Sequence, residues 1–223
     1  MLDSQFLFQE IMPALNKGLV VSLLLILPSA VAGLFLGLSA GSLRVFGPGW
    51  LRWVAAAYIG AFRGTPLVVQ LFVLYFGLPN LGIYLEPYTA AVLGFSLCGG
   101  AYHAEYIRGG LQSIKKGQLQ AAQALGFAHW KAILHIILPQ ALRRALPGCG
   151  NELIYLIKYS SLAYIITCTE LTGQAKNLAS SSFRFTEVFI VAGIYYLVLV
   201  TLATFGLQKL EKRLQVPGFG RAG

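Results

Sequence analysis

Five long apolar stretches are the feature that most restricts how this chain of 223 residues can fold. A helix that crosses the hydrocarbon core of a bilayer needs about 20 mostly apolar residues. The stretches that reach this length are 19–43, 53–78, 88–107, 146–168 and 188–207. Charged residues make up only 11% of the chain, whereas soluble domains average roughly 25%. The sequence therefore predicts an all-α, polytopic membrane protein with about five transmembrane helices.

The basic residues between these stretches indicate which side of the membrane each loop faces. One side carries twelve of them: Arg44, Arg52, Arg108, Lys115, Lys116, Lys131, Arg143, Arg144, Lys209, Lys212, Arg213 and Arg221. The other side carries three, Lys17, Lys176 and Arg184. Because cytoplasmic loops are enriched in Lys and Arg, we expect the C-terminus in the cytoplasm and the N-terminus outside. The expected division is a periplasmic segment at 1–18, one transmembrane domain at 19–208 and a cytoplasmic tail at 209–223.

Several classes of function find no support in the residues. The net charge of +9 does not indicate a nucleic-acid partner, because the basic residues lie between apolar runs rather than on one face. His103, His129 and His135 show no metal-ligand spacing, so we expect no metal or cofactor and interpret them as polar surface or interfacial residues. The sequence has no phosphate-binding G-x-x-x-x-G-K-S/T loop. Any ATP hydrolysis would therefore take place in a separate subunit.

Small residues recur every fourth position in the first stretch, at Ser29, Gly33, Gly37 and Gly41. This spacing lines them along one helix face, where another helix can approach closely. We interpret the three glycines as a helix-packing surface. The alternative is that they reflect only the general abundance of glycine in membrane helices.

The second stretch is interrupted by Arg63, Gly64 and Pro66. Glycine is flexible and proline lacks a backbone donor, so the helix is predicted to break or kink here. Backbone freed at membrane depth is tolerated where it is buried in protein or lines a cavity. The break is thus a candidate border of a translocation pathway, with Arg63 as a candidate substrate ligand. Snorkelling of Arg63 toward an interface explains the pattern equally well.

Four further charged residues lie in or beside the apolar stretches: Glu105, Glu152, Lys158 and Glu170. A charge at the bilayer centre costs on the order of 3 kcal/mol, so such residues usually face a bundle interior or a water-filled cavity. We expect Glu105 and Glu170 at interfaces, because they lie near stretch ends. Glu152 and Lys158 lie well inside the fourth stretch and are candidate site residues.

The longest polar segment, 108–145, is expected in the cytoplasm and carries helix-favouring residues. It is interpreted as two short helices joined at Gly126, with Pro139 ending the second helix. Gln120, Ala121 and Ala122 precede that glycine. The residues alone predict a structured loop able to dock on a partner.

This segment resembles the Glu-Ala-Ala loop of type I importer permeases. In that family a Glu-Ala-Ala run, a glycine four residues after the second alanine and a later Ile-x-Leu-Pro form the coupling helix that inserts into the ATPase. The matching residues here are Gln120, Ala121, Ala122, Gly126 and Pro139. The resemblance implies that this loop couples the chain to a separate ATPase subunit.

The resemblance extends over residues 18–207, and within the family the chain is most similar to polar amino-acid permeases. The runs that carry it are 62–67, 105–110, 139–143, 150–152 and 160–163. It implies a type I ATP-binding-cassette (ABC) importer permease fold in a bacterial inner membrane. The implied partners are ABC ATPase subunits, an external substrate-binding protein, a second copy or related permease, an amino-acid substrate and membrane lipid.

Two residues depart from the family pattern. Gln120 stands where the family usually has Glu, and an amide can hydrogen-bond but cannot form an ionic contact. Tyr159 stands where many members have Asp, which removes a potential partner for Lys158. The alternative function is an ion-coupled secondary transporter or channel without an ATPase, although such proteins often have duplicated halves with paired broken helices.

Glu152 is the residue that we expect to bind the positively charged group of the substrate. Burying an ammonium or a carboxylate without a partner costs several kcal/mol or more. Glu152 and Lys158 are six positions apart, on different faces of a helix. We therefore expect Glu152 to face the cavity and bind an ammonium or a cationic side chain, and Lys158 to be structural. The alternative is that Glu152 braces a helix against its neighbour.

Overall fold

The computed structural model describes residues 4–214. Within that range the chain is helical and has no β-strand. The α-helices are α1 (Ser4–Phe6), α2 (Met12–Phe46), α3 (Gly49–Gly64), α4 (Leu67–Phe72), α5 (Pro87–Gln112), α6 (Lys116–Ala124), α7 (His129–Ala132), α8 (Leu138–Tyr159), α9 (Leu171–Ser182) and α10 (Phe185–Leu214). Three π-helical turns, at Leu7–Ile11, Val73–Gly77 and Ile133–Ile137, and two 3-10 segments, at Leu78–Leu81 and Ser160–Ile166, join some of them.

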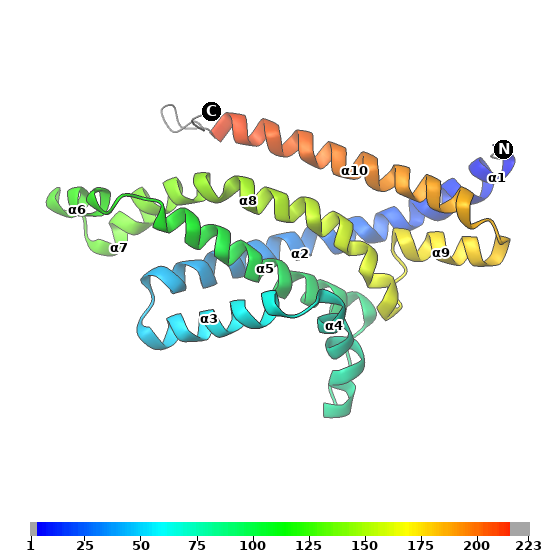
Figure 1. Ribbon diagram of the computed structural model, residues 1–223, viewed down its shortest axis with the longest axis horizontal. Helices are drawn as coiled ribbons and strands as arrows, with labels where there is room; N and C mark the ends of the chain where they lie inside the picture. Colours follow the sequence, from blue (N-terminus) through cyan, green and yellow to red (C-terminus); the bar gives the residue numbers. More distant parts are fainter. Residues whose placement is uncertain (1–3, 215–223) are drawn as a thin grey trace.

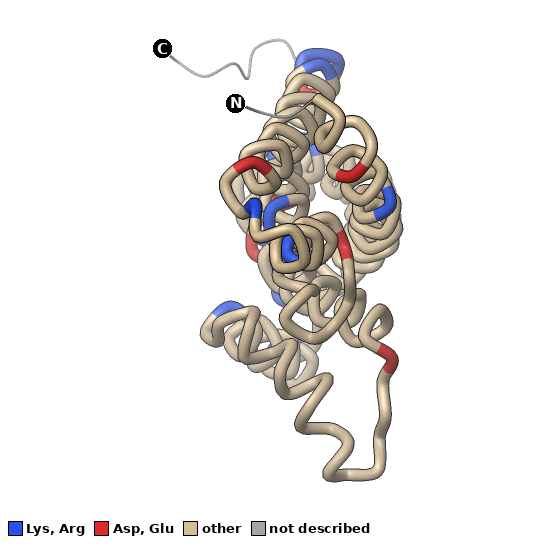
Figure 2. The backbone as a smooth tube through the Cα atoms, turned by 90° about the vertical axis from the view of Figure 1, so that its right-hand side faces the viewer, with Lys and Arg blue, Asp and Glu red and all other residues tan. Residues whose placement is uncertain are grey.

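Four long helices, α2, α5, α8 and α10, run along the length of the molecule (Figure 1). Helix α5 packs between α2 and α8, and α10 packs against α8 and α9. Helices α6 and α7 lie at one end of the bundle, and α9 lies beside the N-terminal helix at the other end. An arm formed by α4 and the turns after it, Leu67–Leu81, projects from the side of the bundle in both views (Figures 1 and 2).

The predicted all-α membrane architecture is confirmed. Among the described residues, the continuous run Ser4–Phe46 and helix Phe185–Leu214 are each long and apolar enough to cross a membrane. The bent pair Gly49–Gly64 and Leu67–Leu81 meets the same test as one broken span. Helix α5 covers the predicted stretch 88–107, and α8 covers 146–159 of the stretch 146–168, which continues into the 3-10 segment Ser160–Ile166. Neither α5 nor α8 meets the spanning test by itself. Each predicted stretch nevertheless has its helix in the bundle.

Helical structure extends beyond the expected transmembrane limits at both ends. The first run begins at Ser4, so most of the expected 1–18 segment continues directly into the first long helix. Helix α10 continues into the expected 209–223 tail as far as Leu214. The remainder of that tail, including Arg221, lies outside the described residues. Helix α9 was not expected from the sequence.

The predicted break after Arg63 is confirmed. Helix α3 ends at Gly64 and α4 begins at Leu67, and the segment Leu67–Leu81 is bent by 105° relative to α3. The side-chain amide of Gln70 donates hydrogen bonds to the carbonyl oxygens of Phe62 (2.8 Å) and Thr65 (3.0 Å). These bonds satisfy acceptors that a helix end leaves free.

The prediction that Pro139 ends a helix is wrong. Helix α6 ends at Ala124 and Gly126 adopts a left-handed φ of 84°, as the expected reversal requires. The helix that begins at His129, however, continues without a break through Ile133–Ile137 into α8. Pro139 is the second residue of α8. The wider π-helical turn before it accommodates a residue that lacks an N–H and would clash in a regular α-helix.

The glycines of α2 lie against α5. A Cβ added to Gly37 would overlap the Cβ of His103 and lie 3.0 Å from the backbone nitrogen of Ala104. A Cβ on Gly41 would lie 2.7 Å from the carbonyl oxygen of Ala104. The two backbones can approach this closely because glycine has no side chain.

We predict that Gly37→Ala lowers the stability of the folded chain by about 1–3 kcal/mol, because an added methyl forces α2 away from α5. The matched control is Gly193→Ala in α10, where an added Cβ meets nothing within 4 Å. Thermal unfolding of the two purified variants in the same detergent measures the difference. Equal unfolding temperatures would show that α2 and α5 tolerate separation.

Candidate functional site

Two adjoining pockets lie beside the helix break. The larger has a volume of ≈ 430 Å³ and is lined by the break itself together with α5 and the end of α8. The smaller has a volume of ≈ 10 Å³ and lies between α2, α5 and α8. Leu67, Cys98 and Tyr159 line both. These three shared residues lie at the boundary between the two pockets.

Glu152 lies in the wall of the smaller pocket and is only 4% exposed. No hydrogen bond or ion pair joins its carboxylate to another described residue. Ser29 and His103 line the same space, and the buried Ser29 Oγ and His103 Nδ1 also have no partner among the described residues. A space of this size holds about one water molecule. The pocket thus collects three buried polar groups that neighbouring side chains do not satisfy.

The placement of His103 corrects a sequence-based expectation. It was interpreted as a surface or interfacial residue, but it is 6% exposed and lies beneath Gly37. A small residue on α2 allows the imidazole to enter the interior of the bundle.

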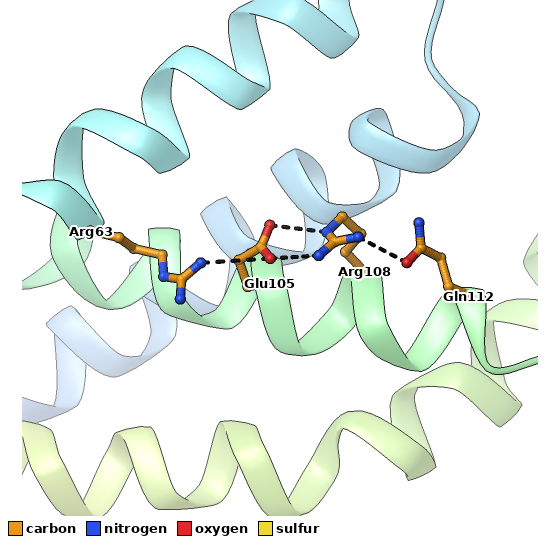
Figure 3. Close-up of polar contacts among 4 residues, drawn as sticks. All are labelled: Arg63, Glu105, Arg108 and Gln112. Carbon is orange, nitrogen blue, oxygen red and sulfur yellow. Dashed lines mark hydrogen bonds and ion pairs between the residues drawn. The ribbon is translucent and has the colours of Figure 1, made fainter.

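Arg63 lies at the rim of the larger pocket, in the last turn of α3. Its side chain is 41% exposed and one guanidinium nitrogen lies 3.6 Å from the Glu105 carboxylate (Figure 3). The guanidinium carbon lies 5.3 Å from the centre of the Tyr102 ring, which lines the same pocket. A cation therefore borders a pocket wide enough for a small molecule.

Lys158 lies elsewhere. Its side chain is exposed, and its Nζ lies 4.7 Å from the centre of the Tyr155 ring. It lines neither pocket. The structure thus brings Arg63 and Glu152 to adjoining spaces and leaves Lys158 apart from both.

Glu170 was expected at an interface but is fully buried. Its carboxylate caps α9 by accepting hydrogen bonds from the backbone N–H groups of Thr172 and Gly173, each at 2.9 Å. The Tyr196 hydroxyl donates to it at 2.9 Å and the Ser22 hydroxyl at 3.4 Å. One acid therefore ties α2, α9 and α10 together. Sequence reasoning missed this role because α9 itself was not expected.

The turn between α6 and α7 lies at one end of the bundle (Figure 1). It exposes apolar side chains. Leu125 is 80% exposed and Trp130 is 60% exposed, on either side of Gly126. Gln120 and Ala121 are exposed, whereas Ala122 is only 4% exposed because α6 packs on α7 and the π-helical turn after it. Such a cluster of exposed apolar residues is typical of an interaction surface.

Comparisons with known proteins agree on one family. A family model described as "binding-protein-dependent transport system inner membrane component" matches residues 33–216. The chain is 40% identical over 207 residues to the glutamine transport system permease protein GlnP of Escherichia coli (strain K12), covering 92% of this chain and 94% of the relative. It is 39% identical over 206 residues to the arginine transport system permease protein ArtQ of Bacillus subtilis (strain 168), covering 91% and 93%.

Solved structures give the same result. The fold matches a structure described as the crystal structure of an amino acid ABC transporter with histidines, at a TM-score of 0.86 and 33% identity, over 96% of this chain and 100% of that one. A chain of the MetNI methionine ABC transporter matches at a TM-score of 0.79 but only 21% identity, covering 92% of this chain and 98% of that one. The second likeness concerns the fold alone.

Proposed function

The chain belongs to the family of binding-protein-dependent transport system inner-membrane components, and we propose that it carries polar amino acids through the pocket at its helix break. It is a multi-pass membrane protein and the permease subunit of an amino-acid ABC importer. The ATPase of such an importer is a separate subunit, and a substrate-binding protein is a further partner. An ion-coupled transporter that works without an ATPase is not favoured.

The proposed substrate class is polar amino acids, including basic ones. Relatives that cover most of this chain are named for the transport of glutamine, arginine and octopine. Glu152 supports a cationic or ammonium-bearing substrate, because it is a buried carboxylate without a partner among the described residues. Buried charges in proteins are normally paired, and an unpaired one costs several kcal/mol. A substrate ammonium would supply the missing partner.

Arg63 completes the proposed site. An amino acid also carries a carboxylate, and guanidinium groups bind carboxylates through charge-assisted hydrogen bonds. Arg63 borders the larger pocket and Glu152 the smaller one, and the two spaces adjoin at Leu67, Cys98 and Tyr159. A zwitterion that spans this boundary would place its carboxylate near Arg63 and its ammonium near Glu152. Lys158 is structural in this proposal.

We predict that Glu152→Gln lowers ATP-dependent uptake of L-arginine by at least about tenfold, because the substrate ammonium loses its charged partner. Glu86→Gln, at an exposed position just before α5, is the matched control and should transport normally. Uptake of L-arginine and L-glutamine by the reconstituted complex measures both variants. Unaltered rates and selectivity in an assembled Glu152→Gln complex would remove Glu152 from the site.

The turn between α6 and α7 is the proposed docking surface for the ATPase, within the coupling segment 120–139. Its exposed apolar residues support this role. Gln120 and Ala121 are accessible to a partner, whereas Ala122 is occupied by contacts within the chain. Gly126 shapes the turn through its left-handed conformation, and Pro139 lies inside the continuous helix behind it.

We predict that Leu125→Asp releases the ATPase, because it places a charge at the centre of an apolar interface. The control is Tyr84→Asp, at a residue of similar exposure (79% against 80%) in the loop between the projecting arm and α5. Substitutions at Gly126 are less informative, since any side chain there strains the turn. Co-purification of the ATPase subunit is the measurement. Full retention of the ATPase by the Leu125 variant would place the docking surface elsewhere.

The proposed membrane orientation rests on the distribution of basic residues, and the proposed covering of the projecting arm rests on its exposed apolar side chains. The N-terminus faces outward, the C-terminus and segment 108–145 face the cytoplasm, and 19–208 forms the transmembrane domain, because basic loops favour the cytoplasmic side. The projecting arm has no charged residue (Figure 2) and exposes large apolar side chains, among them Val73 and Phe76. A second permease copy or a related permease, together with membrane lipid, would cover this arm.

A further inference from the structure

Glu105 holds two arginines with very different geometry (Figure 3). Arg108, one turn further along α5, donates two hydrogen bonds to the carboxylate, at 3.0 and 2.7 Å. Gln112 fixes Arg108 in turn through a hydrogen bond of 2.8 Å. Arg63 makes a single contact of 3.6 Å from another helix, and its side chain is more exposed than that of Arg108, at 41% against 29%. Arg63 is therefore the weakly held partner.

The surroundings of Arg63 allow it to change partners. Its guanidinium lies against the Tyr102 ring, whose face attracts a cation without competing for its hydrogen bonds. Both residues line the larger pocket. If Arg63 turns toward an anion in that pocket, Glu105 keeps both hydrogen bonds from Arg108. Breaking an ion pair is costly when it leaves a charge without a partner. Here no carboxylate is left unpaired.

We propose that Glu105 is a positioning residue that holds Arg63 while the pocket is empty and competes with the substrate carboxylate for it. This inference rests on the proposed function, in which Arg63 binds the carboxylate of an amino acid. Binding exchanges one ion pair for another, and the return of Arg63 to Glu105 helps to release the substrate. The rigid Arg108–Gln112 anchor keeps Glu105 within reach of Arg63 throughout this exchange.

The proposed competition predicts tighter substrate binding when Glu105 is neutralised, which a purely structural role of Glu105 would not produce. In Glu105→Gln the competing charge is removed, and the local field near Arg63 becomes more positive. The substrate carboxylate should then bind about threefold more tightly, the size expected for a partly exposed ion pair. Turnover should slow by a similar factor, because a substrate that is bound more tightly in the ground state is released more slowly. A structural defect would weaken binding instead.

The test uses the permease–ATPase complex in nanodiscs, without the binding protein, and equilibrium binding of radiolabelled L-arginine and L-glutamine. Binding of agmatine, which lacks the carboxylate of arginine, should not become tighter in Glu105→Gln. The matched control is Glu187→Gln, which removes another 3.6 Å ion pair, between Arg184 just before α10 and Glu187 in its first turn. Glu105→Asp, which keeps the charge but shortens its reach toward Arg63, replaces Glu105→Gln if that variant does not assemble.

A double-mutant cycle with Arg63→Gln decides whether the effect passes through Arg63. The inference requires that Glu105→Gln has no effect on L-arginine binding once Arg63 is replaced. Unchanged or weaker binding in the single variant, or the same change in both backgrounds, would overturn it. If the wild-type complex binds neither amino acid, the proposed substrate site fails as well, so the two failures are distinguishable.

Discussion

Backbone polar groups inside a bilayer must find partners within the protein, and this constraint shapes the site. A break in a span normally leaves carbonyl oxygens unpaired, so a pocket cannot simply be cut into a membrane helix. Here the Gln70 side chain reaches back across the break and donates to Phe62 and Thr65. The chain can therefore turn by 105° and open a pocket while these two carbonyl oxygens keep hydrogen-bond donors. Everything proposed for Arg63 depends on that turn.

Close packing of α2 on α5 is the second requirement. The glycines of α2 bring the two backbones together and allow His103 to lie in the interior. Helix α5 thereby presents His103 to the smaller pocket, Tyr102 to the larger and Glu105 to Arg63. Helix α5, held in place by the glycines of α2, thus contributes to the walls of both pockets and supplies the partner of Arg63.

The sequence predicted the parts of this architecture that depend on local chemistry. The five apolar stretches, the break before Pro66 and the reversal at Gly126 follow from residue types and spacing alone. The parts that depend on tertiary contacts were missed. Pro139 is tolerated inside a helix because of the π-helical turn before it, and Glu170 is buried because three helices donate to it. Neither arrangement leaves a pattern in neighbouring residues.

The central claim is that substrate passes through the pocket at the break, and protection of Thr65 from a thiol reagent tests it most directly. Thr65 lines the larger pocket and is exposed. In a complex whose native cysteines, Cys98, Cys149 and Cys168, are replaced, Thr65→Cys should react with a water-soluble maleimide. Saturating L-arginine or L-glutamine should slow that reaction. A reaction rate that neither amino acid changes, in a complex that still transports them, would contradict the account.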